Sequence, residues 1–295
     1  MRLINPSFQI LEQQSGLEGI DKIIEIAGRL SHKSENNITE DSAKKFVDKM
    51  INLGHLAVLE HGTVYLYIPR EEAYNASGES WVYPKYCENP YSRVGYHAGN
   101  YYITTNYRVL VENGWQEDLK YLCEPIEWHV KRVAVKFICD RGVLAEFTRH
   151  RVFSFMAEST RYCNYSKDKF NNEITFIKPC WLNIPEGNYS YWDGEWVDVE
   201  KMKIQLSKEN NTANSFLWAL DDAERAYKIL LNKGWTAQEA RAVLPNATKT
   251  ELIMTGFVSD WEHFFLLRDD IAAHPQAREL AHPLHELFIQ RGLIK

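Results

Sequence analysis

The chain has 295 residues, of which 45% are hydrophobic and 25% are charged, a composition typical of globular proteins. Its net charge of -6 argues against a general nucleic-acid-binding protein, which would usually be basic. No apolar run approaches the about 18 residues that a membrane helix needs, and the initial MRLINPSFQI lacks the apolar core of a signal peptide. We therefore expect a soluble cytoplasmic protein with no membrane or nucleic-acid partner.

The five cysteines favour the same compartment. They are odd in number, widely spaced and form no C-x-x-C pair, so neither a disulfide framework nor a zinc ribbon is expected. We interpret them as reduced, mostly buried thiols.

The first half of the chain contains two predicted helices and two predicted strands. Apolar residues at helical spacing predict helices at 19–30 and 41–53. Two β-rich segments, Thr63–Ile68 and Arg132–Cys139, predict strands. Between them, the stretch from Arg70 to Asn106 is dense in Tyr, Asn, Gly and Pro, and we expect it to have little regular structure.

The second half is mainly helical. A short helix is predicted at 142–150, and a second irregular region is expected from Asn164 to Trp196. Further helices are predicted at 213–233, 236–244, 259–270 and 274–290. We expect a single mixed α/β (α+β) domain spanning 1–295.

The segment from Thr148 to Ser166 concentrates charge. Its cations are Arg149, His150, Arg151 and Arg161, and they surround Ser154, Glu158 and Ser159. Cations this close repel one another unless solvent or an anion accommodates them. The apolar residues at 152–157 indicate partial burial, and phosphate is the natural partner of a buried guanidinium. An exposed basic face is the alternative.

Two more arginines fall on predicted apolar helix faces. Arg241 follows a capping box formed by Thr236 and Glu239, and Arg268 follows one formed by Ser259 and Glu262. An arginine on an apolar face needs a partner, which can be an anionic ligand or an internal carboxylate. The three histidines near the C-terminus (His274, His282 and His285) are interpreted as surface or interface residues.

Several blocks of this sequence resemble the flavin-dependent thymidylate synthases. Arg149-His150-Arg151, seven residues and then Ser159 reproduce the RHR-x7-S signature of that family. Similar blocks occur in the same order at 29–31, 54–61, 239–245 and 264–268. The resemblance covers about residues 21–286, and implies a small central antiparallel sheet flanked by helices, with long insertions at about 70–130 and 164–200.

The resemblance implies reductive methylation of dUMP to dTMP. It implies bound FAD, the co-substrates 5,10-methylenetetrahydrofolate and NADPH, and a homotetramer whose active sites are shared between chains. No metal and no cysteine nucleophile are expected. The hydride chemistry belongs to the cofactor, and the protein orients dUMP and stabilises developing charge.

Specific positions follow from the same resemblance. The residues expected to bind FAD are Ser31, His55, Glu60, His61, Arg149, His150, Arg151 and His263, the last in place of the family's usual Asn. The residues expected to bind dUMP are Glu146, Glu158, Ser159, Arg161, Arg241 and Arg268. Glu146 replaces a usual Gln, and Glu158 stands one position later than the usual carboxylate. Ser159, Arg268 and His150 are the expected catalytic residues, with Ser159 interpreted as a positioning hydroxyl because no base is evident beside it.

Two alternatives from other classes remain. One is a non-catalytic nucleotide- or RNA-binding protein that uses the arginines and the Tyr/Trp-rich stretches for stacking. The other is a metal-dependent hydrolase built on His55, Glu60, His61 and His150, although their spacing matches no zinc motif.

Overall fold

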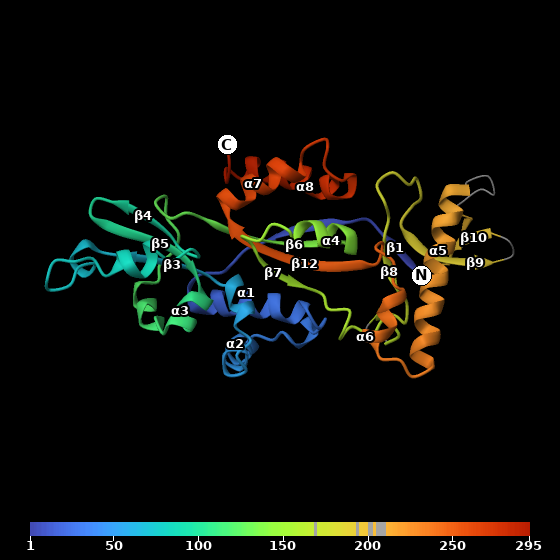
Figure 1. The fold of residues 1–295 in the computed structure, drawn as a ribbon, viewed down its shortest axis with the longest axis horizontal. Helices are drawn as coiled ribbons and strands as arrows, with labels where there is room; N and C mark the ends of the chain where they lie inside the picture. The colour runs from blue at the N-terminus through green and yellow to red at the C-terminus, as the bar shows by residue number, and fades with distance from the viewer. Residues whose placement is uncertain (168–169, 193–194, 200–202, 205–210) are drawn as a thin grey trace.

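The computed structural model describes residues 1–167, 170–192, 195–199, 203–204 and 211–295, which form three β-sheets and the helices around them (Figure 1). The order of the strands is β2-β6-β12-β7 in the central sheet, β3-β5-β4 in a second sheet, and β11-β10-β9-β1-β8 in a third. Figure 1 shows the three sheets strung along the long axis, with the central sheet in the middle.

The central sheet is antiparallel throughout. Its strands are β2 (Ser7–Leu11), β6 (Arg132–Asp140), β12 (Lys249–Phe257) and β7 (Ser154–Ala157). In the register of β12, Met254 lies opposite Val135 on one side and Phe155 on the other. The prediction of a small antiparallel sheet between helices is confirmed.

Alternation along β12 assigns its two faces to two hydrophobic cores. Ile253 faces the core that contains α1 (Gly16–Leu30), whereas Leu252 and Met254 face the core of α7 (Val258–Arg268) and α8 (Pro275–Gln290). The first face also carries α2 (Ser42–Asn52), and the second carries α4 (Arg141–Phe147). Figure 1 shows α1 and α2 below the sheet and α7 and α8 above it.

The stretch at 70–106 is more regular than expected. It contains β4 (Arg93–His97) and β5 (Asn100–Asn106), which pair with β3 (Thr63–Ile68). The turn between them, Ala98–Gly99, has positive φ at both residues, the conformation that two-residue hairpins favour. The expectation of little regular structure is wrong here, because the Tyr, Ile and Thr residues of β5 favour a strand and are buried when it pairs with β3 and β4. α3 (Tyr107–Asn113) follows β5.

The stretch at 164–196 also contributes strands, so the same expectation is wrong there. β1 (Arg2–Ile4) pairs with β8 (Thr175–Ile177) and with β9 (Gly187–Trp192), and β9 continues to β10 (Glu195–Asp198) and β11 (Lys203–Ile204). α5 (Asn211–Asn232) contributes to the core of this unit through Leu217 and Leu220. The N-terminal strand thus orders a segment far from it in the sequence.

The predicted C-terminal helices are present, with changed ends. α6 covers only Ala237–Ala240, and a 3₁₀ turn, η7 (Arg241–Val243), follows it. α7 begins at Val258, where Asp260 accepts a hydrogen bond from the N–H of Phe257, so the expected Ser259–Glu262 capping box is wrong. α8 runs through Pro283.

Short helical turns complete the chain. They are η1 (Glu35–Asn37), η2 (Leu56–His61), η3 (Arg70–Glu72), η5 (Gln116–Tyr121) and one π-helical turn, η4 (Tyr83–Cys87). Of the helices in the described ranges, none has both the length and the apolar content to cross a bilayer.

Candidate functional site

The Arg-rich segment begins at the end of α4. Asp140 caps this helix by accepting a hydrogen bond from Val143 N–H at 2.7 Å. The turn from 149 to 153 then leads into β7, and it leaves Arg149 and Arg151 exposed while His150 is buried. The apolar neighbours therefore bury one of these three residues, and the two flanking guanidiniums face solvent.

His150 lies beneath the side chain of Arg268. Arg268 Nε donates to His150 Nε2 at 3.0 Å, and its two terminal nitrogens reach Glu146 Oε2 at 2.7 Å and the Glu146 carbonyl at 2.9 Å. Burial, together with the smaller effects of the charges of Arg268 and His263, lowers the pKa of His150 to about 4. The imidazole is therefore neutral at pH 7 and accepts the hydrogen bond.

The contacts of Arg268 settle its position within one chain. In this structure the partner of Arg268 is an internal carboxylate rather than a ligand, because Glu146, which lies 122 positions away in the sequence, binds its guanidinium. His263 is exposed on α7, with its ring 6.3 Å from that of His150. Glu146, His150, His263 and Arg268 therefore form one cluster, hereafter the Arg268 cluster, on the α7 side of the central sheet.

A second group forms where α1 ends. Ser159 N–H donates to the carbonyl of Ser31 at 2.9 Å, which joins two motifs that are far apart in the sequence. Arg161 is exposed and lies over the ring of Tyr162, and Arg241 Nη1 donates to Thr160 Oγ1 at 3.1 Å. Ser31, Ser159, Arg161 and Arg241 are hereafter the Ser159 cluster.

Arg241 does not lie on an apolar face. α6 ends one residue earlier, and the 3₁₀ turn that follows leaves the side chain of Arg241 exposed. The expectation that Arg241 falls on an apolar helix face is wrong, because the periodicity of an α-helix does not continue through that turn. The Thr236–Glu239 cap itself is present, since Glu239 Oε2 accepts from Thr236 N–H at 2.7 Å.

His55, which precedes η2, and Glu60 and His61, which lie in η2, have different surroundings. His55 is exposed, and Glu60 pairs with Arg108 at 2.6 Å. His61 is 1% exposed, and its Nδ1 lies 2.8 Å from Thr255 Oγ1. Burial, together with the charge of Arg132, lowers the pKa of His61 to about 3.

His61 lines a pocket of about 550 Å³. Arg132 and Tyr65 also line this pocket, which lies between β2, β6 and the start of α1. Within the described ranges, His61 Nε2 and Arg132 Nε are buried and make no hydrogen bond. A polar ligand with suitable acceptors would satisfy such nitrogens.

The four residues of the hydrolase alternative make separate contacts. Glu60 binds Arg108, His61 binds Thr255 and His150 binds Arg268, while His55 is exposed. Across the residues that the structure describes, no group of three or more His, Cys, Asp or Glu side chains could hold a metal ion.

The structure adds residues that the sequence did not single out. Lys33, Lys136, Lys249 and Glu251 form ion pairs next to the Ser159 cluster, and Lys249 also pairs with Glu158. The sequence pattern that could have pointed to Lys249 and Glu251 is their spacing of two, which places both on one face of a strand, followed on that face by apolar Ile253. His282 and His285, interpreted as surface or interface residues, both bind Asp269 at 2.8 Å.

Comparison with known proteins identifies the class of this mixed α/β protein. The family model described as thymidylate synthase complementing protein matches residues 124–291, which is more than half of the chain. The chain belongs to this family.

Three relatives are similar over about half of this chain. A probable flavin-dependent thymidylate synthase of Paramecium bursaria Chlorella virus 1 is 26% identical over 180 residues, 58% of this chain and 74% of the relative. The flavin-dependent thymidylate synthase of Synechocystis sp. is 27% identical over 54% of this chain and 66% of its own. That of Pyrococcus furiosus is 29% identical over 53% and 54%. The match to the last two thus spans less than two thirds of their length.

One solved structure aligns along most of the chain. The UMP/dUMP methylase PolB from Streptomyces cacaoi, bound with 5-Br dUMP, covers 98% of this chain and 93% of its own, at 16% identity and a TM-score of 0.43. A likeness at that distance supports no inference about the site.

Proposed function

We propose that this protein is a flavin-dependent thymidylate synthase that acts in the cytoplasm. It methylates dUMP to dTMP with bound FAD, taking the carbon from 5,10-methylenetetrahydrofolate and reducing equivalents from NADPH. The observation that carries the proposal is the hydrogen bond from Ser159 N–H to the Ser31 carbonyl at 2.9 Å. It brings the residue expected at the flavin beside the residue expected at the nucleotide, within a chain of the matching family.

The side chains of the Ser159 cluster suit a nucleotide phosphate. Arg161 and Arg241 come from separate segments, both residues are exposed, and Arg241 reaches the turn that carries Ser159 and Thr160 through its hydrogen bond to Thr160. Guanidiniums bind phosphate oxygens in pairs of hydrogen bonds, and the Ser159 hydroxyl adds a short polar contact. In this proposal Ser159 positions the nucleotide, and Arg268 and the neutral His150 stabilise charge on the ring.

The donor groups available also fit a flavin dinucleotide. His61 and Arg132, whose Nε2 and Nε atoms have no hydrogen-bond partner among the described residues, border a pocket, and the exposed Arg149 and Arg151 suit a pyrophosphate. Ser31, His55, Glu60 and His263 complete the proposed set. A bound flavin supplies the hydride-transfer chemistry, and these residues hold it and orient the nucleotide against it.

The arrangement favours a site shared between chains. The Arg268 cluster lies on the α7 side of the central sheet, whereas the Ser159 cluster lies at the end of α1, on the other side. A single chain therefore separates groups that one small nucleotide must contact together. We propose that a homotetramer unites them, with each site built from more than one chain.

The test is an assay of dUMP-dependent NADPH oxidation with added 5,10-methylenetetrahydrofolate and identification of dTMP. The proposal expects a protein with flavin absorbance and dTMP formation in step with NADPH consumption. A colourless protein that takes up no FAD and forms no dTMP would contradict it. Stoichiometric zinc or iron in that protein would instead favour the hydrolase, and RNA binding without catalysis would favour the binding-protein alternative.

A further inference from the structure

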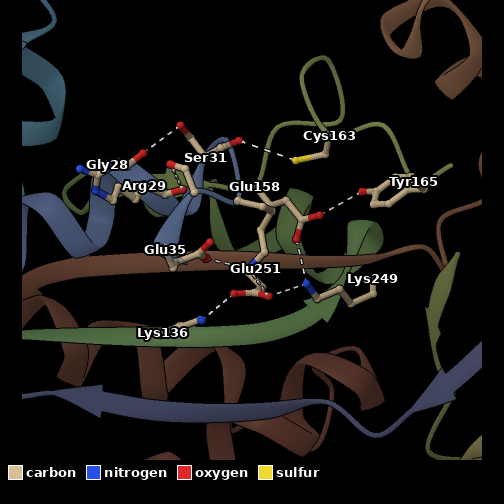
Figure 2. A network of polar contacts seen from close by, with 12 residues as sticks. Gly28, Arg29, Ser31, Glu35, Lys136, Glu158, Cys163, Tyr165, Lys249 and Glu251 are labelled. Carbon is tan, nitrogen blue, oxygen red and sulfur yellow. Dashed lines mark hydrogen bonds and ion pairs between the residues drawn. The ribbon is translucent and has the colours of Figure 1, made fainter. Parts of the chain in front are cut away.

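A network of six charged side chains covers the end of the central sheet beyond the last turn of α1 (Figure 2). Its members are Lys33, Glu35, Lys136, Glu158, Lys249 and Glu251. Three positive and three negative charges balance within it. The network adjoins the Ser159 cluster because Glu158 directly precedes Ser159.

Glu158 is buried at one end of this network, with 3% of its surface exposed and Lys249 as its ion-pair partner. Its Oε1 accepts from the hydroxyl of Tyr165 at 3.1 Å, and its Oε2 pairs with Lys249 Nζ at 2.8 Å. Its backbone N–H donates to the Glu251 carbonyl at 2.8 Å. Both carboxylate oxygens are therefore engaged inside the protein, as Figure 2 shows.

Lys249 connects Glu158 to the sheet. Its ammonium group also pairs with Glu251, and Glu251 in turn binds Lys33 at 2.8 Å and Lys136 at 2.6 Å. Burial raises the pKa of Glu251, but the charges of Lys249 and Lys33 outweigh burial and hold this pKa well below its usual range. Glu251 is thus a fixed negative charge that holds Lys249 in place.

The turn after Glu158 is held from two directions. On one side, Ser159 N–H binds the Ser31 carbonyl, and the Tyr162 ring stacks on His32 with centroids 4.4 Å apart. On the other side, the Glu158 side chain ties the start of the turn to Lys249. Within the turn, Cys163 N–H donates to the Ser159 carbonyl at 2.9 Å.

We infer that Glu158 and Lys249 are positioning residues that fix the 159–163 turn for the nucleotide, and that the Glu158 carboxylate does not itself contact the substrate. This inference rests on the proposed function. It revises the expectation that Glu158 binds dUMP, because a carboxylate with both oxygens engaged has to break a buried ion pair before it can bind a ligand. It assigns to Lys249, a residue outside the recognised motifs, a role in ordering Ser159 and Arg161.

The first experiment needs no nucleotide. Amide hydrogen exchange is measured by mass spectrometry on peptides that span 158–166 of the full-length protein, in wild type, Lys249→Met and Glu158→Gln. Both variants should exchange at least about tenfold faster in this segment, because loss of a buried ion pair releases the turn. Lys136→Met is the matched control, since Lys136 binds Glu251 but not Glu158, and its peptides should exchange as in wild type.

The second experiment measures dUMP kinetics in the same proteins. Glu158→Gln and Lys249→Met should raise the KM for dUMP about tenfold with little change in kcat, and the double variant should be no worse than either single variant. Lys249→Arg should have a KM for dUMP close to that of the wild type, because arginine retains the positive charge. Tyr165→Phe, which removes only a hydroxyl group, should shift KM and exchange in the same direction by a smaller factor, and it serves if the other variants do not fold.

The outcomes separate the inference from the proposed function. If Lys249→Met leaves both exchange and KM unchanged while Glu158→Gln raises KM, Glu158 contacts the nucleotide and the inference fails. Additive effects in the double variant would contradict the inference as well, because two residues that hold one turn together act as a unit. If the wild type binds no dUMP and forms no dTMP, the proposed function fails, and the exchange experiment still decides whether Lys249 and Glu158 order the turn.

Discussion

Arg268 lies against Glu146, with 2.7 Å between guanidinium Nη1 and carboxylate Oε2. The ion pair is partly buried, since the side chains are 16% and 28% exposed. A nucleotide that uses Arg268 must compete with this carboxylate for the same donor. Glu146 therefore weakens the binding of a nucleotide to Arg268, and a neutral residue at this position would weaken it less.

Replacement of Glu146 by Gln is the first prediction. This change keeps the shape and removes the competing charge, so dUMP binding should tighten by about 1 kcal/mol, or about fivefold. Isothermal titration of dUMP into the FAD-loaded protein measures the change. Glu262→Gln, at an exposed carboxylate of α7, is the control and should have no effect. Weaker binding in Glu146→Gln would mean that the ion pair supports the site.

Arg161 should be a main contact of the nucleotide phosphate. Its replacement by Ala is expected to weaken dUMP binding by roughly 2–5 kcal/mol, the range for loss of a charge-assisted contact that becomes desolvated on binding. FAD affinity, followed by flavin fluorescence, should change much less. The exposed Arg225 on α5, paired with Asp221, provides a matched control. An unchanged dUMP dissociation constant in Arg161→Ala would remove this residue from the substrate site.

The neutral state of His150 predicts a pH dependence of stability. Its pKa falls from 6.5 to about 4 on folding, so between these values the unfolded state binds the extra proton. The free energy of unfolding is therefore highest, as far as His150 is concerned, above pH 6.5. It decreases by at most about 3 kcal/mol as the pH falls towards 4. Urea unfolding of wild type and His150→Gln measures it. The stability difference between the two proteins should shift in favour of the variant as the pH drops from about 7 to about 5, and a constant difference would contradict the low pKa.

Two threonines on β12 provide a matched pair. Thr255 is 1% exposed and binds His61, whereas the Thr250 hydroxyl is fully buried and makes no hydrogen bond within the described ranges. Thr255→Val leaves Nδ1 of a buried histidine without its partner and should destabilise the fold by about 1–3 kcal/mol. Thr250→Val removes an unsatisfied hydroxyl and should be neutral or stabilising. Denaturant unfolding measures both, and equal effects would show that the Thr255–His61 contact contributes nothing.

The sequence predicted the helices well because their apolar periodicity is strong. α1, α2, α5, α7 and α8 lie within a few residues of their expected bounds. The central strand β12 was missed for a physical reason: one of its faces changes from charged Lys249 and Glu251 to apolar Ile253, since it leaves a polar network and enters a core. No uniform alternation marks such a strand.

The candidate site was predicted in part. The sequence identified the residues of both clusters, and the contact between Ser31 and Ser159 brings two of its motifs together. It could not decide whether a carboxylate or a ligand partners Arg268, because Glu146 is distant in sequence and equally able to bind a guanidinium. It also could not reveal the network around Lys249, whose members come from four separate segments.

The core on the α1 side of the central sheet joins residues of α1, β3, β5 and α3 to Ile253 of β12. The sheet formed by β3, β5 and β4 therefore shares a hydrophobic core with α1 and β12, even though it precedes the family match that begins at residue 124. A protein fragment that contains only residues 124–291 would lack α1 and Ser31. The face of β12 that carries Ile253 would then be exposed to solvent. Such a fragment should aggregate when expressed, and a minimal version of this protein has to retain its first half.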